Sequence, residues 1–225
     1  GEDLMWYCCN LFQISRQTTL QVLKIKSHSF SSMEHLGVIL RPLIHLKYLA
    51  LDGNIFLHDA ESADAQSAFS QVIRGMSNLR VLSLREYDLM VGHLAYMFGG
   101  LKELRHLSAE GLGDDSMLEI SKNCPKLQYL CILGRPDVPD VSASAVKEVL
   151  TSCPIRELVL DFNKANGDMI QTCHYKDFVK ASPTLLVLRC YGVFYTFNDQ
   201  DFQNAQEAIM ASEGKVIFFS KHSDE

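Results

Sequence analysis

The sequence lacks the features that mark membrane and secreted proteins. Apolar runs such as residues 4–9 are far too short to cross a bilayer. The opening Gly-Glu-Asp shows no signal-peptide succession of basic, apolar and small residues. An initiating Met is also missing, which suggests a fragment or a processed chain. No Asn-x-Ser/Thr glycosylation acceptor occurs.

The sequence also contains no long run of like charges, and its cysteines follow no pairing pattern. The net charge is −6, and Lys24 with Lys26 is the nearest approach to a basic stripe, so a nucleic-acid role is disfavoured. Seven cysteines, at positions 8, 9, 124, 131, 153, 173 and 190, are odd in number and not grouped at the chain ends. Such scatter favours a reducing compartment. We therefore expect a cytoplasmic or nuclear protein that binds neither nucleic acid nor membrane.

A Leu-x-x-Leu-x-Leu motif recurs along the chain. Its copies start at Leu20, Leu46, Leu79, Leu104, Leu127, Ile155 and Leu185, at spacings of 26, 33, 25, 23, 28 and 30 residues. Spacings of this size are typical of leucine-rich repeats. Alternate side chains of a strand face opposite sides, so Leu49 and Leu51 are predicted to point inward together. A last strand is predicted over residues 215–219.

Between these motifs the apolar residues follow helical spacing. The sets are Met33, Leu36, Ile39, Leu40 and Leu43; Phe69, Val72, Ile73 and Met76; Val91, Leu94, Ala95, Phe98 and Leu101; Met117, Ile120 and Cys124; Val146, Val149, Leu150 and Cys153; and Phe202, Ala205 and Ile209. Ser32 and Asp115 are predicted to cap helix starts. Pro125, Pro154 and Pro183 are predicted to mark helix ends.

A strand-plus-helix unit cannot bury its apolar face alone, so neighbouring units must stack. We therefore predict an α/β fold, a leucine-rich-repeat solenoid with the parallel β-sheet on the concave face of a curved horseshoe arc and the helices on the convex face. Residues 1–225 are expected to form a single domain. Within it, residues 1–19 are an N-terminal cap or the remnant of an upstream domain, residues 20–213 hold about seven repeats, and residues 214–225 form a final strand and tail.

Two junctions carry a resemblance to a known family. Asn123-Cys124-Pro125-Lys126-Leu127 and Ser152-Cys153-Pro154-Ile155 both place Cys-Pro before the next strand motif, and Ala181-Ser182-Pro183 is a version without Cys. Over residues 20–213 the chain resembles the cysteine-containing leucine-rich repeats of F-box proteins. Residues 1–19 contain no F-box, and the cysteine that such repeats usually carry a few residues after the strand is missing.

The resemblance implies a protein–protein interaction module, the substrate-recognition part of an F-box-type (SCF) ubiquitin ligase. A small adaptor, contacted through an upstream segment, would link such a protein to a cullin. The alternatives are an intracellular repeat scaffold, an immune-receptor sensor and an enzyme-inhibitor domain, none of them tied to a ubiquitin ligase.

A protein partner is expected on the concave face, at strand residues that point outward. The candidates are Tyr48, Arg85, His106, Glu110, Tyr129, Cys131, Leu133, Glu157, Asp161, Arg189 and Tyr191. The stretch from Tyr129 to Tyr191 is the richest in apolar residues, and we hypothesise that it carries the main contact; otherwise these are ordinary exposed strand residues. The acidic segment 52–64 is a second candidate, either a loop that touches a basic partner or a solvated one.

Catalytic signatures were not found, so neither an enzymatic activity nor a cofactor is expected. Cys124 and Cys153 are predicted to be buried apolar filler. Cys173-His174 could be half of a metal site, but no second pair lies at suitable spacing, so zinc is not expected. His106 could titrate when a partner binds, or could be an ordinary exposed imidazole.

Overall fold

The computed structural model describes Arg16 and residues 18–26, 33–52, 63–85, 91–134, 141–161, 170, 172–191, 199–211 and 214–220. Several predictions fall wholly or largely outside these residues. They are the cap or remnant over residues 1–19, the helix start at Ser32, most of the acidic segment 52–64 and the tail after residue 220.

Eight strands form one sheet in chain order, and each strand is parallel to the next. The strands are β1 (Val22–Lys26), β2 (Tyr48–Asp52), β3 (Val81–Arg85), β4 (His106–Glu110), β5 (Tyr129–Leu133), β6 (Glu157–Asp161), β7 (Val187–Tyr191) and β8 (Val216–Ser220). The seven strands predicted at the leucine motifs are confirmed, and the predicted final strand begins and ends one residue later than expected. Parallel neighbours need a crossover connection, which explains the helix between successive strands.

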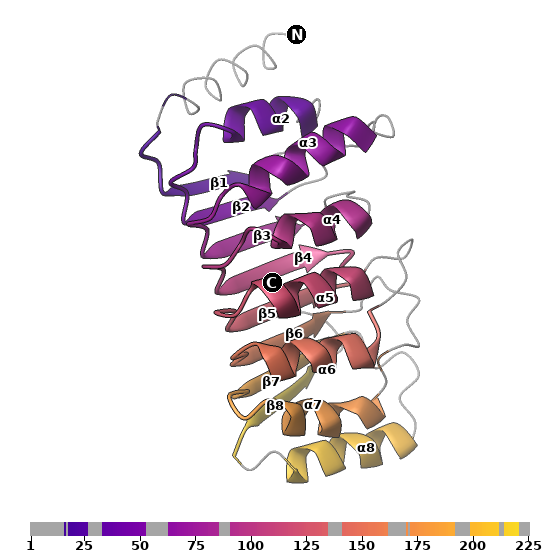
Figure 1. Cartoon of the computed structure of the whole chain (residues 1–225). Helices are drawn as coiled ribbons and strands as arrows, with labels where there is room; N and C mark the ends of the chain where they lie inside the picture. The colour runs from indigo at the N-terminus through magenta and orange to yellow at the C-terminus, as the bar shows by residue number, and fades with distance from the viewer. Residues whose placement is uncertain are drawn as a thin grey trace.

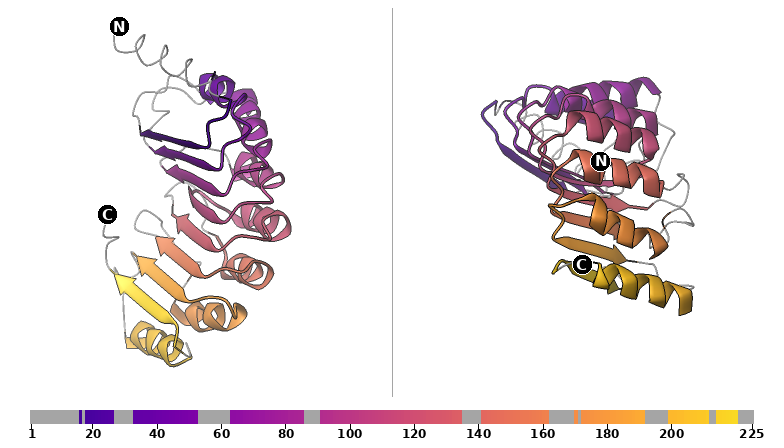
Figure 2. Two further views of the ribbon diagram at one scale, coloured as in Figure 1. Left: turned by 90° about the vertical axis from the view of Figure 1, so that its left-hand side faces the viewer. Right: turned by 60° about the horizontal axis from the view of Figure 1, so that its bottom comes forward.

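The helices form one layer against one face of the sheet (Figure 1). They are α2 (Met33–Leu40), α3 (Ala63–Arg74), α4 (Val91–Phe98), α5 (Asp114–Asn123), α6 (Ala143–Ser152), the 3-10 helix η1 (Thr172–His174), α7 (Tyr175–Ala181) and α8 (Asp199–Met210). The other face of the sheet carries no described helix (Figure 2). The result is an open, solenoid-like array of strand-and-helix units. Among the described helices, none combines the length and the apolar character needed to cross a membrane.

The core lies between the sheet and the helix layer, and the motif leucines fill it. Leu46, Leu49 and Leu51 are fully buried, as predicted for the second unit. The same positions are buried in the units that follow, and α2 adds Met33, Leu36 and Leu40 from the helix side. Burying one such side chain stabilises the fold by about 1.5–3 kcal/mol. Because the same positions are buried in successive units, the core continues from unit to unit.

Three helices end just before a proline, as predicted, and their C-cap residue directly precedes it. The C-caps of α5, α6 and α7 are Cys124, Cys153 and Ser182. Cys124 and Cys153 are buried, and the thiol of Cys153 points at the backbone oxygen of Cys124 from 3.4 Å. Ser182 is buried at the equivalent place and donates to the Ile155 carbonyl at 3.3 Å. The junction therefore places a small, buried side chain against the preceding unit.

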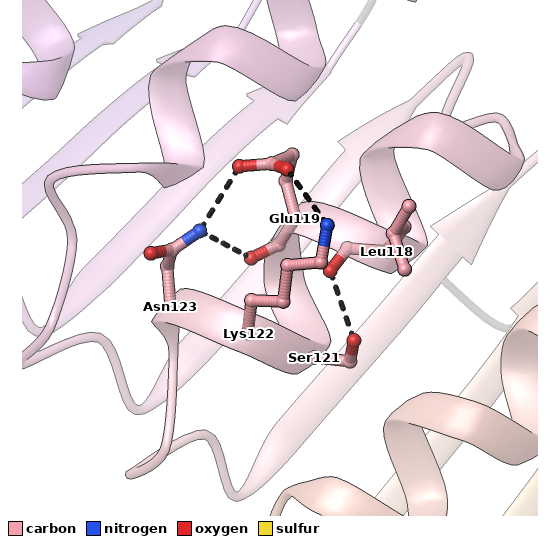
Figure 3. A network of polar contacts seen from close by, with 5 residues as sticks. All are labelled: Leu118, Glu119, Ser121, Lys122 and Asn123. Carbon is pink, nitrogen blue, oxygen red and sulfur yellow. Dashed lines mark hydrogen bonds and ion pairs between the residues drawn. The ribbon is translucent and has the colours of Figure 1, made fainter.

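Polar contacts close the last turn of α5 just before this junction (Figure 3). Asn123 Nδ2 donates to the backbone oxygen and to Oε2 of Glu119, both at 3.0 Å. Lys122 Nζ lies 3.5 Å from Glu119 Oε1, and Ser121 Oγ donates to the Leu118 carbonyl at 2.9 Å. The charge of Lys122 is thus matched within its own helix.

The helix predictions needed three corrections. Helix α7 was not predicted, although Tyr175, Phe178 and Val179 have helical spacing and are buried. In α8 Ala208 is buried, whereas the predicted Ile209 is 51% exposed. Asp115 does not cap α5: the N-cap is Gly113, which has no side-chain cap bond.

Candidate protein-binding surface

The sheet face without helices presents its side chains in rows. We call this surface the open face, and define it by the first, third and fifth residues of β1 to β7. Strand pairing aligns Tyr48 with Val81, then His106, Tyr129 and Glu157 in one continuous row. Because neighbouring strands lie about 4.8 Å apart, side chains in a row are within contact distance of each other.

All eleven predicted partner-binding residues lie at open-face positions, in strands β2 to β7. They differ in accessibility. Arg85 and His106 are exposed. Seven residues are half-buried: Tyr48, Tyr129, Leu133, Glu157, Asp161, Arg189 and Tyr191. The remaining two, Glu110 and Cys131, are 8% and 3% exposed, so neither offers much surface to a partner.

Shielding is concentrated in the middle of the open face. Ser108 and Val159 are 9% and 6% exposed and flank Cys131 in the strand register. In the predicted stretch from Tyr129 to Tyr191, the side chains accessible to a partner therefore lie mainly at the edges. Its accessible side chains are the two tyrosines and the charged groups beside them, while Cys131 and Val159 form the floor.

Aromatic and charged side chains contact each other across the open face. Lys24 Nζ lies 4.8 Å from the ring centroid of Tyr48, within the range of a cation–π contact. The rings of His106 and Tyr129 have centroids 5.9 Å apart. Adjacent strands thus hold one another's side chains, which reduces the conformational entropy that a partner would have to remove on binding.

Tyr129 and Cys131 remain protonated at neutral pH. Burial raises the pKa of the Tyr129 hydroxyl, and its neighbour Cys131 adds to the effect. Burial also raises the pKa of the Cys131 thiol, while the nearby Ser108 hydroxyl and the charge of Arg85 lower it. A raised thiol pKa makes Cys131 a poor nucleophile at neutral pH.

Cys173 and His174 are the residues that the sequence offers as half of a metal site. Cys173 is exposed, and the His174 ring lies 6.5 Å from the ring of Phe178. Within the described ranges, no three His, Cys, Asp or Glu side chains are close enough together to hold a metal ion.

Comparison with known proteins gives one weak similarity. The chain is 28% identical over 167 residues to an F-box/LRR-repeat protein of Arabidopsis thaliana. The likeness is to a leucine-rich-repeat protein. The aligned part covers 68% of this chain and 34% of that protein, so the chain spans about a third of its relative's length. No family model matches the sequence. Together with the repeating strand-and-helix units, this similarity supports a role in protein–protein interaction.

Proposed function

We propose that the chain is a leucine-rich-repeat module that recognises a protein partner on the open face, with this face forming the concave side of a curved arc. The observation that carries the proposal is the arrangement of the open face itself. It combines half-buried tyrosines with charges of both signs, in register across seven strands and with no described helix covering them. Tyrosine and arginine are over-represented among the residues that dominate interface energies.

The partner contact is assigned to the stretch from Tyr129 to Tyr191. Tyr129 and Tyr191 present half-buried rings at opposite corners of β5 to β7. Between them, Glu157 and Arg189 form an ion pair, and Asp161 adds a further negative charge. Charges of both signs beside apolar rings suit a protein surface better than a uniform polyanion.

Within the cell, the module is proposed to be the substrate-recognition part of an F-box-type ubiquitin ligase, in the cytoplasm or nucleus. The weak similarity to an F-box/LRR-repeat protein and the Cys-Pro junctions support this assignment. The chain would contribute binding rather than catalysis, and its partners would be a protein substrate and, through sequence outside this chain, a ligase adaptor.

Affinity capture of the full-length protein tests the ligase link. We expect mass spectrometry to recover a cullin and its adaptor together with candidate substrates. Repeated capture without either ligase component would exclude the ligase assignment, and would favour a scaffold, sensor or inhibitor role.

Surface variants test the open face separately. Tyr129→Ala and Tyr191→Ala should each weaken the binding of a captured substrate by about 2 kcal/mol, which raises its Kd roughly 30-fold. Leu118→Ala is the matched control, because Leu118 is 44% exposed on α5, in the helix layer. Circular dichroism should confirm that all three variants fold. If substrate affinity is the same in the tyrosine variants and in the control, the open face is not the docking surface.

A further inference from the structure

A second candidate surface lies at the edge where the strands begin. The residues at the second position of successive Leu-x-x-Leu-x-Leu motifs are joined by backbone hydrogen bonds and form a row. Arg80 N donates to the Lys47 carbonyl and Arg105 N to the Arg80 carbonyl, both at 2.8 Å. Gln128 and Arg156 continue the row, with bonds of 2.8 and 2.7 Å. We call Lys47, Arg80, Arg105 and Arg156 the basic row.

Positive charge is concentrated at this edge far beyond the average of the chain. The first six connectors that lead from a helix to a strand, before β2 to β7, cover residues 41–47, 75–80, 99–105, 124–128, 153–156 and 182–186. Their basic residues are Arg41, Lys47, Arg80, Lys102, Arg105, Lys126 and Arg156, and their one acidic residue is Glu103. Seven positive charges and one negative give +6, whereas the whole chain has −6. The rest of the chain therefore carries −12.

These cations are poorly neutralised within the protein. Lys126 pairs with Glu103, but no other connector cation has an ion pair with a residue that the structure describes. The hydrogen bond from Lys126 lowers the pKa of Glu103, and Arg105 and Arg80 lower it further through their charge. The single carboxylate of Glu103 thus interacts electrostatically with three cations. In addition, Arg105 Nε is shielded from solvent without a hydrogen-bond acceptor in the described part of the chain.

Helix dipoles do not explain the row. Cations at a helix C-terminus are stabilised by the exposed carbonyl groups, but the effect fades within the last turn. Arg41 directly follows α2 and fits that explanation. Lys47, Arg80 and Arg105 come six or seven residues after a helix end, at the start of the next strand.

A small cavity that is open to solvent adjoins the end of the row at Lys47. Its volume is about 290 Å³, and its lining residues are Thr19, Gln21, His45, Lys47 and Asn78. Asn78 Nδ2 donates to the Ile44 carbonyl at 3.3 Å, which fixes the amide at the rim. The lining offers an ammonium group and several further donors, a set that suits a carboxylate.

We propose that the basic row binds a short acidic segment of a partner protein, with a carboxylate seated in the cavity beside Lys47. From β2 to β6 the row spans four strand spacings, roughly 19 Å, the length of about six extended residues. Arginine guanidinium groups bind carboxylates through two parallel hydrogen bonds. A long nucleic acid would run past the row and meet the net negative charge elsewhere on the chain, which favours a short acidic peptide.

The row also borders the open face. Lys47 directly precedes Tyr48, and Arg105 directly precedes His106. A partner on the open face could therefore place an acidic segment over this edge. The proposal does not depend on the open face as a docking surface, because it concerns different side chains and a different probe.

Fluorescence anisotropy with the whole chain tests the proposal. The probe is a labelled peptide of six Asp and Glu residues, and a labelled oligothymidylate of six nucleotides serves as the nucleic-acid arm. Arg80→Gln with Arg156→Gln removes two exposed charges of the row. Lys147→Gln with Lys180→Gln removes two exposed charges from helices α6 and α7 and leaves the row intact.

We expect the row variant to bind the peptide about tenfold more weakly than the unmodified chain, a loss of about 1.4 kcal/mol. The control variant should change affinity less than about twofold, because distant exposed charges are screened. Arg80→Lys with Arg156→Lys keeps the charge but loses the paired hydrogen bonds. Its affinity for the peptide should lie between those of the unmodified chain and the row variant. No peptide binding, equal weakening in row and control variants, or tighter binding of the oligonucleotide at physiological salt would each overturn the proposal. Thermal melting of every variant checks that it is folded.

Discussion

Arg189 and Glu157 join β7 to β6 across the open face: Nε of Arg189 donates to Oε1 of Glu157 over 2.7 Å. This bond raises the pKa of Arg189, while burial opposes the shift. The two side chains are 40% and 31% exposed, so solvent screens the pair strongly. The pair orders the stretch between Tyr129 and Tyr191 more than it stabilises the fold.

A double-mutant cycle on this pair should give a small coupling energy. With Glu157→Ala and Arg189→Ala, we expect a coupling of about 0.2–1 kcal/mol in urea unfolding, the range of exposed ion pairs. The coupling should decrease in 1 M salt, where the Debye length is about 3 Å. A coupling of several kcal/mol would mean that the pair is effectively buried.

Gly100 is predicted to be a position where no side chain fits. A Cβ there would lie 1.9 Å from the backbone oxygen of Arg74, and backbone cannot yield as a flexible side chain can. Gly100→Ala should therefore cost at least about 2 kcal/mol of unfolding free energy. Gly92→Ala is the control, because nothing lies within 4 Å of its Cβ position, and it should not destabilise α4. Equal stability of the two variants would contradict the close approach between the connector and α3.

Ser142 is expected to fix the start of α6. Its Oγ accepts from Ala145 N at 3.2 Å, and its own N donates to Asp114 Oδ1 at 2.8 Å. Ser142→Ala should lower the unfolding free energy by about 1 kcal/mol, the usual effect of losing an N-cap. Ser152→Ala is the comparison, since Ser152 is exposed in the last turn of α6 and should be near neutral. Denaturant titration of both variants measures the difference.

The buried thiols should resist alkylation and make the fold sensitive to alkali. Burial raises the pKa of Cys124 to about 12 and that of Cys153 to about 11. At pH 8 iodoacetamide should modify the exposed Cys173 in the native chain and leave Cys124 and Cys153 unmodified, as peptide mass spectrometry would show. Fast labelling of Cys124 would contradict its burial.

The sign of the pH effect follows from the direction of these shifts. A thiol whose pKa is higher in the folded state stabilises the fold fully below its unfolded pKa, which is about 8.5. That contribution is lost as the pH rises towards 11 and 12. The unfolding free energy of the unmodified chain should therefore fall above about pH 8.5. It should fall less steeply in Cys124→Ala with Cys153→Ala, and identical pH slopes would contradict the prediction.

Much of the fold could be predicted because its signal is local. Strand positions follow from the leucine motif, and helix ends follow from Pro125, Pro154 and Pro183, since proline lacks the N–H that a helix needs. Helix α7 escaped prediction because its seven residues give only one turn of apolar spacing, at Tyr175, Phe178 and Val179. The Asp115 cap was wrong because α5 begins one residue earlier, at Asp114, which leaves Asp115 inside the first turn.

The sequence by itself determined which side of each strand faces the core and which side is free, because alternation along a strand is a property of the backbone. Only the tertiary structure decided which free positions are accessible and which residues stand side by side. Cys131 and Glu110 point to the open face and are nevertheless buried, while Lys47, Arg80 and Arg105 become neighbours despite separations of 33 and 25 residues. The physical reason is that hydrogen-bond register aligns the strands whatever the length of the connections between them.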